Sequence, residues 1–172
     1  GRGTSGYDFK VMSESLQRLI TDFTRHGGNI FVSGCHVAGD LWKGPEATSA
    51  DKEFARRTLH MSYNGDMATR RGETRILASP MGMTRSTIEF NREPTRDFYG
   101  VESPGCISPY GRNAYIAMRY ATNNQPAAVC YNGNDYRSVV MAFPFESILD
   151  ASQRDMLMRG VLAFFERSGG GE

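Results

Sequence analysis

Residues 27–38, with the sequence GGNIFVSGCHVA, constrain the fold more than any other part of the chain. Two glycines, which can end a helix, precede an apolar run of strand length. A small, turn-forming segment then carries Cys35 and His36. A strand that ends in a tight turn before a helix can hold a reactive side chain at its tip, so this stretch predicts a strand–turn–helix unit.

The rest of the chain alternates between helical and strand patterns. Helices are expected from Ser13 to the glycine pair, from Ser49 to about Leu59, and after Asp150, each with a capping residue at its start. Their expected buried faces are Leu16, Leu19, Ile20 and Phe23 in the first, Phe54, Ala55 and Leu59 in the second, and Leu157, Val161, Leu162 and Phe165 in the third. Strands are expected at 30–33, 74–78, 86–90, 127–131 and 138–143, and residues 114–120 fit either a strand or a short helix.

This order of elements is typical of an α/β domain with helices packed on a sheet. The apolar run at 30–33 is nearly continuous, which favours a strand covered on both faces of a parallel sheet. Residues 91–113 are rich in proline and glycine and are expected to be a long irregular excursion, a kind of segment that often carries function. We expect one domain over residues 12–167, between a flexible lead-in at 1–11 and a loose tail at 168–172.

Composition excludes several classes of function. The net charge of +1, from 20 basic and 19 acidic side chains, provides no long-range attraction for nucleic acid or an anionic membrane surface. No apolar run is long enough for a transmembrane helix. The sequence carries neither metal-ligand spacing nor a glycine-rich phosphate or dinucleotide loop, so we expect no metal and no cofactor. Its three cysteines make no disulfide framework.

Cys35 is the first candidate catalytic residue. At the tip of a strand its thiolate could attack an amide or ester carbonyl while the following backbone N–H groups hold the oxyanion. His36 is the neighbouring candidate base, His60 is a second one, and Glu146, which follows a strand and a proline, could orient the base. Each residue also has a structural interpretation: Cys35 as a small buried side chain, His60 as a helix-terminal cation, and Glu146 as an acceptor of turn N–H groups. No histidine follows position 60, so a cysteine–histidine pair with a late strand is excluded.

Arginine and aromatic residues in loops form a second candidate site. Arg96, Tyr99 and Tyr110 lie in the 91–113 excursion, where tyrosine rings could stack on a sugar and a guanidinium group could bind a carboxylate. Further arginines occupy loops and strand ends at positions 70, 71, 75, 85 and 92. The structural alternative is packing over the core for the rings and solvation for the guanidinium groups. These residues nevertheless favour glycan binding as a hypothesis of a different class.

Four segments of the chain resemble the glutamine-amidotransferase-like domain of secreted bacterial proteins, which are often labelled xanthan lyases. The segments are residues 27–42, 126–131, 136–140 and 143–165, and the similarity extends over about residues 10–167. The resemblance implies a flavodoxin-like, three-layer α/β/α fold with a mostly parallel sheet, and a location outside the cytoplasm. Such domains have more than one strand before the turn, so this chain is expected to lack or reduce its first strand–helix units and to expose a sheet edge.

The motifs of active members of this family are matched only in part. Active members carry Gly-x-Cys-x-Gly, where this chain has Ser33, Cys35 and Val37, and His-Pro-Glu, where it has Pro144, Phe145 and Glu146. The cysteine and the glutamate are retained and the catalytic histidine is absent. Because loss of the base in a triad costs orders of magnitude in rate, the resemblance implies a non-catalytic, vestigial module of a larger exported protein concerned with polysaccharide.

Two alternatives stay open beside that hypothesis. One is a cysteine-dependent amide or ester hydrolase that uses Cys35, and the other is a glycan-binding module. Lyase activity follows from the family's label alone. The expected partners are other domains of a parent chain, carbohydrate, and a second copy of this chain paired at the exposed sheet edge.

Overall fold

The computed structural model describes residues 10–96 and 99–167 of the 172-residue chain. The helices are α1 (Glu14–Arg25), α2 (Val37–Trp42), α3 (Ser49–Arg57) and α4 (Ala151–Glu166), with a 3-10 turn η1 (Phe145–Ser147). The strands are β1 (Ile30–Ser33), β2 (Met61–Gly65), β3 (Glu73–Ile76), β4 (Thr87–Glu89), β5 (Cys106–Pro109), β6 (Ala114–Tyr120), β7 (Pro126–Asn132) and β8 (Arg137–Met141). Most of the lead-in expected at 1–11 and the tail at 168–172 lie outside the described residues.

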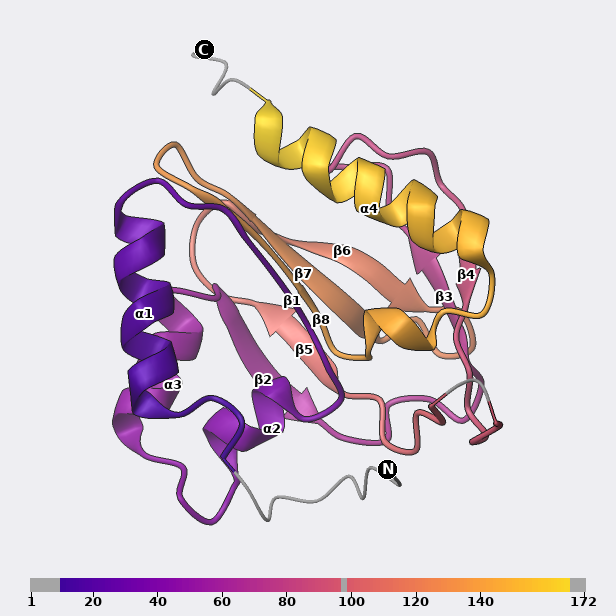
Figure 1. Cartoon of the computed structure of the whole chain (residues 1–172), viewed down its shortest axis with the longest axis horizontal. Helices are drawn as coiled ribbons and strands as arrows, with labels where there is room; N and C mark the ends of the chain where they lie inside the picture. The colour runs from indigo at the N-terminus through magenta and orange to yellow at the C-terminus, as the bar shows by residue number, and fades with distance from the viewer. Residues whose placement is uncertain (1–9, 97–98, 168–172) are drawn as a thin grey trace.

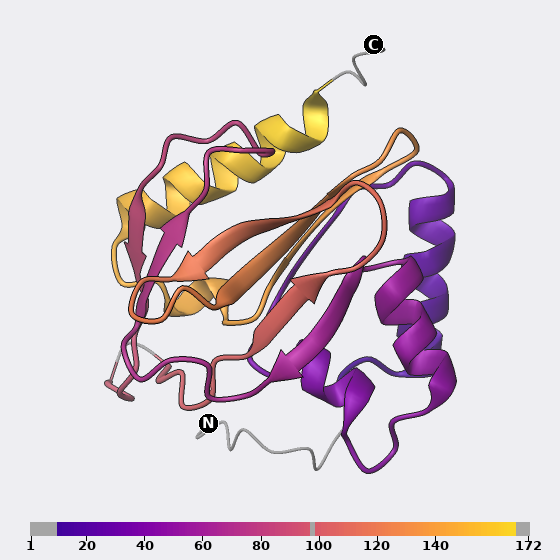
Figure 2. The ribbon, with the colours of Figure 1, turned by 180° about the vertical axis from the view of Figure 1, so that it is seen from behind.

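The strands form two sheets with helices on both sides. A six-stranded sheet has the order β1-β8-β7-β6-β3-β4, and β2 pairs with β5 in a second, two-stranded sheet. Helix α4 covers one face of the large sheet, as Figure 1 shows. The β2–β5 pair lies over the other face, with α2 and α3 beside β2, as Figure 2 shows.

Two buried apolar clusters fill the space between these layers. The first joins the large sheet to α4 and includes Tyr120, Phe143, Leu157 and Phe164. The second joins the sheet to β2, β5, α2 and α3 and is built around residues such as Leu41, Leu59, Met61, Ile107 and Val140. Because each cluster lies on one face of the large sheet, the interior strand β8 is buried on both sides.

The expected flavodoxin-like fold with a mostly parallel sheet is wrong. Only β1 and β8 are parallel, and every other pairing in the large sheet is antiparallel. The physical reason lies in the chain segments that join the strands. Two neighbouring parallel strands need a crossover connection of a dozen or more residues, usually a helix. Between α3 and β8 the described residues form no helix, so consecutive strands there return as hairpins and give a mixed, mostly antiparallel sheet.

The strand β1 is correctly placed in the sequence, and it pairs in parallel with β8. It is an edge strand of the large sheet, and its four residues are half-buried, with Phe31 packed against the first core cluster and Ile30 and Val32 against the second. A sheet edge therefore lies at β1. The sequence predicts an exposed edge but does not place it at this strand. Pairing of this edge with a second copy of the chain stays a prediction.

Helix α1 begins and ends where the sequence predicts, but it is rotated relative to its expected buried face. Ser13 caps its start, yet Leu19 and Phe23 are 66% and 52% exposed. The buried side chains are Gln17 and Thr24. Gln17 donates hydrogen bonds to the Met12 carbonyl and to a carboxylate oxygen at the start of α3, so polar contacts orient this helix.

The other two long helices follow their predicted bounds closely. Helix α3 is capped by Thr48, one residue before the expected Ser49, and its expected inward residues are buried. Asp150 caps α4 by accepting hydrogen bonds from the backbone of Ser152 and Gln153. The apolar face of α4 differs from the expectation, because Phe164 is fully buried while Leu162 is 51% exposed.

Candidate functional site

The turn between β1 and α2 holds Cys35 as the sequence predicts. The Gly34 N–H donates a hydrogen bond to the Met141 carbonyl at 3.2 Å, which fixes the turn to the end of β8. Helix α2 then begins at Val37. The Cys35 side chain, however, points into the first core cluster and is only 7% exposed.

Residues of the 91–113 excursion bury this thiol. A Cβ added at Gly105 would lie 3.1 Å from the Cys35 carbonyl oxygen, and the Gly105 N–H donates to the Ala142 carbonyl at 2.8 Å, so this backbone packs against the turn. Burial raises the pKa of the Cys35 thiol to about 12, although a hydrogen bond with the Ser103 backbone and the charge of Arg92 act in the opposite direction. The thiol is therefore protonated at neutral pH and is a poor nucleophile.

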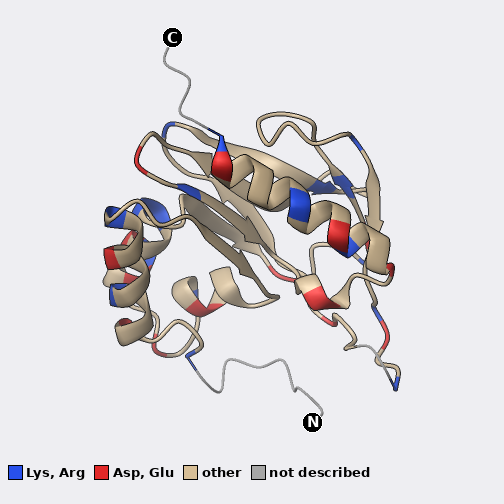
Figure 3. Cartoon of the chain, turned by 45° about the horizontal axis from the view of Figure 1, so that its top comes forward, with Lys and Arg blue, Asp and Glu red and all other residues tan. Residues whose placement is uncertain are grey.

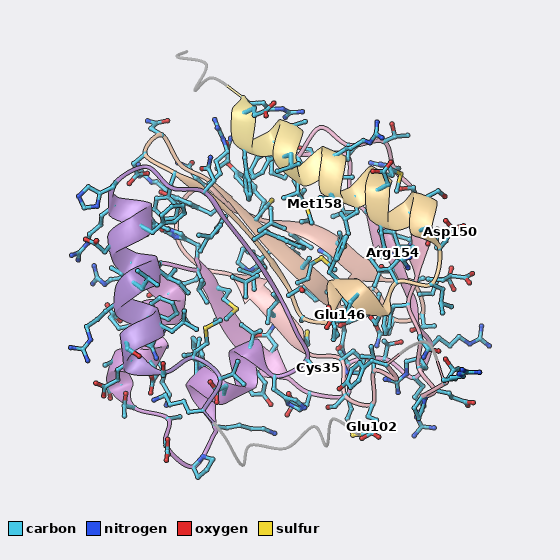
Figure 4. The ribbon with its side chains drawn as sticks, in the orientation of Figure 1. Cys35, Glu102, Glu146, Asp150, Arg154 and Met158 are labelled. Atoms are coloured by element: carbon cyan, nitrogen blue, oxygen red, sulfur yellow. The ribbon has the colours of Figure 1, made fainter. Side chains whose placement is uncertain are left out.

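Glu146 lies near Cys35 but does not activate it. The residue belongs to η1, is exposed, and lies at the same end of the sheet as Cys35, as the labels in Figure 4 show. The Phe145 N–H donates to the Ser33 hydroxyl at 3.2 Å, which holds η1 against the end of β1. The negative charge of Glu146 raises the pKa of the Cys35 thiol further, so this carboxylate disfavours the thiolate.

His36 and His60, the two candidate bases, lie in different surroundings. His36 is the N-cap residue of α2, and its side chain makes no capping hydrogen bond. His60 stacks on Tyr131, with ring centroids 3.5 Å apart, and its Nε2 lies 2.9 Å from the Tyr136 hydroxyl. Tyr136 precedes β8, which runs parallel to β1, so His60 lies at the end of the sheet where β1 begins. The length of β1 therefore separates His60 from Cys35.

The expected glycan-binding residues do not converge on one surface. Tyr99 is half-buried against the first core cluster and interacts with the Cys35 thiol. Tyr110 follows β5, and its N–H donates to the His60 carbonyl at 2.9 Å, which places it at the opposite end of that strand. Arg96 is exposed in the segment before β5. Two rings at opposite ends of β5 cannot flank the same sugar.

A polar hollow that the sequence analysis did not identify lies beside β2 and the β6–β7 turn. It has a volume of about 550 Å³ and is lined by amide and guanidinium groups, among them Asn64, Arg70, Arg71, Asn123 and Gln125. Asn123 donates a hydrogen bond to the Ala68 carbonyl at 2.6 Å, which fixes the turn against the loop after β2. Arg70 and Arg71 were the only signal in the sequence, because Asn123 and Gln125 come from a turn about fifty residues further on.

A smaller hollow of about 400 Å³ lies at the β3–β6 end of the large sheet and is lined by three arginines. No group of three or more potential metal ligands occurs among residues 10–96 and 99–167. Within the same ranges, no helix has the length and apolar character needed to cross a membrane.

Comparison with known proteins identifies the fold alone. No known family model and no curated protein sequence matches the chain. Three solved structures that do match are β-galactosidases. That from Rahnella sp. R3 is 11% identical, with a TM-score of 0.57 over 87% of this chain and 20% of its own. That from Bacillus circulans sp. alkalophilus is 15% identical, with a TM-score of 0.56 over 86% of this chain and 20% of its own. The third, a GH42 enzyme, is 13% identical, with a TM-score of 0.54 over 86% and 19%.

The resemblance to glutamine-amidotransferase-like domains is therefore wrong, and the xanthan lyase label that accompanied it has no support. The three solved structures quoted above are β-galactosidases, and the sheet of this chain is mostly antiparallel. The segments that carried the resemblance contain a capped helix after a strand and a turn after a strand, which are local features that many folds share. The chain spans about a fifth of the length of each of these three β-galactosidases.

Proposed function

We propose that this chain is a non-catalytic module of a larger carbohydrate-active protein, in which Cys35 packs the core and does not react. The observation that carries the proposal is the burial of the thiol, whose pKa is raised to about 12. The fold likeness to one fifth of three β-galactosidases supports an association with carbohydrate-active proteins.

Burial keeps Cys35 from acting as a nucleophile, because the thiolate and not the thiol attacks a carbonyl group. A thiol with a pKa of about 12 is ionised in only about one molecule in 10⁵ at pH 7. A base within reach could compensate, but His60 lies at the other end of the sheet and is held by Tyr136. The nearby Glu146 raises the pKa of the thiol instead of lowering it.

Alkylation with iodoacetamide tests this proposal against a cysteine hydrolase. Cys35, Cys106 and Cys130 are all buried and all have raised pKa values, so the folded protein should label slowly at all three. Mass spectrometry of the peptides gives the three rates, and unfolded protein gives the reference. A Cys35 rate far above the other two would favour the hydrolase.

Turnover assays complete the test. The native protein and Cys35→Ser should release ammonia from glutamine, and nitrophenol from a nitrophenyl ester or a nitrophenyl β-galactoside, at the same background rate. Cys35→Ser is the matched control because it keeps the size of the side chain. Turnover above background in the native protein would overturn the proposal, whether or not it depends on Cys35.

Glycan binding is a second candidate function, favoured by the polar hollow beside β2. Amide and guanidinium groups are the side chains that fix the orientation of a sugar by hydrogen bonding, and the volume of about 550 Å³ suits a small saccharide. A glycan array tests it, with Arg70→Ala as the variant and the equally exposed Arg18→Ala as the control. We expect binding that only Arg70→Ala weakens, and an absence of binding at millimolar glycan would contradict this function.

A further inference from the structure

Two arginines face each other across neighbouring strands at the β3–β6 end of the large sheet. Arg75 of β3 and Arg119 of β6 are register partners in an antiparallel pairing. Side chains in such a pair lie on the same face, with Cβ atoms about 5 Å apart, and like charges placed there are destabilising. Figure 3 shows basic positions in blue on neighbouring strands at this end of the sheet.

A third arginine completes a basic hollow. Arg85 comes from the segment that joins β3 to β4 and lines the same hollow of about 400 Å³ as Arg75 and Arg119. The remaining lining includes Thr87, which is the register partner of Arg75 and therefore lies on the same face of the sheet. Three arginines and this threonine therefore line one space, and their guanidinium and hydroxyl groups can donate hydrogen bonds.

Backbone carbonyls orient two of these guanidinium groups without neutralising them. Arg119 donates from Nη1 to the Asn124 carbonyl at 2.7 Å, and Arg75 donates from Nη2 to the Ala121 carbonyl at 3.5 Å. Both acceptors lie in the short turn between β6 and β7. The groups are thus held toward the turn with their positive charge intact.

No acidic side chain forms a salt bridge with these arginines in the part of the chain that the structure describes. The residues that line the hollow include no aspartate or glutamate, and no salt bridge within residues 10–96 and 99–167 involves these arginines. The nearest acidic positions along β3 and β4 are Glu73 and Glu89, which are register partners of each other and lie on the same face as Arg75. They lie outside the lining of the hollow, so the lining itself carries only positive charge.

We propose that this hollow binds an oxyanion group, such as the carboxylate of an acidic sugar or a sulfate or phosphate group. A guanidinium group matches such oxygens in a bidentate geometry, and charge-assisted hydrogen bonds of this kind are the stronger ones in proteins. The volume admits a ligand of monosaccharide size. A bound anion would also remove the repulsion between Arg75 and Arg119. This site is separate from the polar hollow beside β2 and does not depend on the proposed function.

Titration of the folded protein with small anions, followed by the NMR signals of its backbone and arginine side chains, tests the proposal. The probes are inorganic sulfate, inorganic phosphate and galacturonate, with galactose as the neutral probe and sodium chloride holding the ionic strength constant. We expect saturable shifts at the β3–β6 end with at least one of the three anions and none with galactose. An affinity that falls as chloride is raised is expected as well.

Two variants and one control decide whether the arginines bind. Arg85→Gln and Arg75→Gln should weaken the affinity at least about tenfold, or about 1.4 kcal/mol. Arg112→Gln removes an exposed arginine outside the hollow and should leave the affinity unchanged. Arg85 lies in an exposed loop, so its substitution should leave the fold intact. The dispersion of the NMR spectrum verifies that each variant is folded.

The outcomes separate the sources of the anion. Stronger binding of galacturonate assigns the hollow to a carboxylate, and stronger binding of sulfate or phosphate assigns it to a tetrahedral oxyanion. Shifts that do not saturate, equal binding of galactose, or equal affinities of the native protein and Arg85→Gln would each overturn the proposal.

Discussion

Asp51 is a buried carboxylate with several hydrogen-bond donors around it. Its side chain is 2% exposed and lies 2.8 Å from the ammonium group of Lys10. Gln17 and the backbone N–H of Thr48 donate hydrogen bonds to it as well. Burial alone would raise the pKa of this carboxyl, but hydrogen bonds from Lys10, Gln17 and Thr48 lower it to about 2. The carboxylate thereby fixes α1, the start of α3 and the entering chain to one another.

A pH-dependent loss of stability follows at this residue. The pKa of Asp51 is lower in the folded protein than its ordinary value of 3.8, so its contribution is fully present well above that value, near pH 5, and is lost as the pH falls through about 2. We expect this residue to account for at most about 2 kcal/mol of the unfolding free energy over that range. Urea unfolding of the native protein and of Asp51→Asn at pH 5 and pH 2.5 measures it.

The Asp51→Asn variant should be less stable at pH 5 and should lose less stability on acidification. Glu46→Gln is the control, because Glu46 is an exposed carboxylate just before the same helix and takes part in none of the salt bridges within residues 10–96 and 99–167. Equal pH dependence of the native protein and Asp51→Asn would contradict the assignment.

At the scale of single elements, α4 shows how a helix is oriented by what it covers. Apolar residues occur around much of its circumference, so the helical period alone admits more than one buried face. The sheet selects the face that carries Leu157, Val161 and Phe164, and leaves Leu162 at 51% exposure. Phe164 also lies against the Arg137 guanidinium, 5.7 Å from its ring centre.

Truncation of two nearby residues of α4 should therefore have very different effects. Phe164→Ala removes a fully buried ring and should lower the unfolding free energy by about 3–5 kcal/mol. Leu162→Ala should change it by only about 0.5 kcal/mol, because that side chain is largely in solvent and alanine favours the helix. Chemical denaturation measures both, and similar losses in the two variants would mean that α4 packs through a different face.

At the scale of the whole molecule, the large sheet is more deeply buried at the interior strand β8 than at its two edges. All five residues of β8 are buried, the four residues of the edge strand β1 are half-buried, and the edge strand β4 has exposed residues at both of its ends. Opening of an interior strand requires loss of both core clusters, whereas an edge strand can open locally.

Hydrogen exchange should reflect this gradient. Backbone amides of β8 should exchange at least about tenfold more slowly than those of β1 and β4. Measurements at several protein concentrations also test the predicted pairing of a second copy at the β1 edge. Protection of β1 that rises with concentration is expected from such pairing, and protection that stays low at every concentration would contradict it.

Features that depend on a few adjacent residues could be predicted from the sequence. The caps at Ser13 and Asp150, the strand before Cys35 and the strands β7 and β8 were all predicted, because capping hydrogen bonds, glycine stops and local strand patterns act over short stretches of chain. By contrast, β2 and β5 were missed, since each is short and is stabilised by its pairing with the other.

Features that depend on contacts between residues far apart in the chain could not be predicted from the sequence and became known from the tertiary structure. The sheet order, the buried faces of α1 and α4, and the hollow lined by Arg75, Arg85 and Arg119 depend on pairings between segments far apart in the chain. The burial of Cys35 is of the same kind, because residues about seventy positions later cover the thiol. A residue's reactivity follows from its solvation and its charged neighbours, and these are set by packing, which a local pattern does not specify.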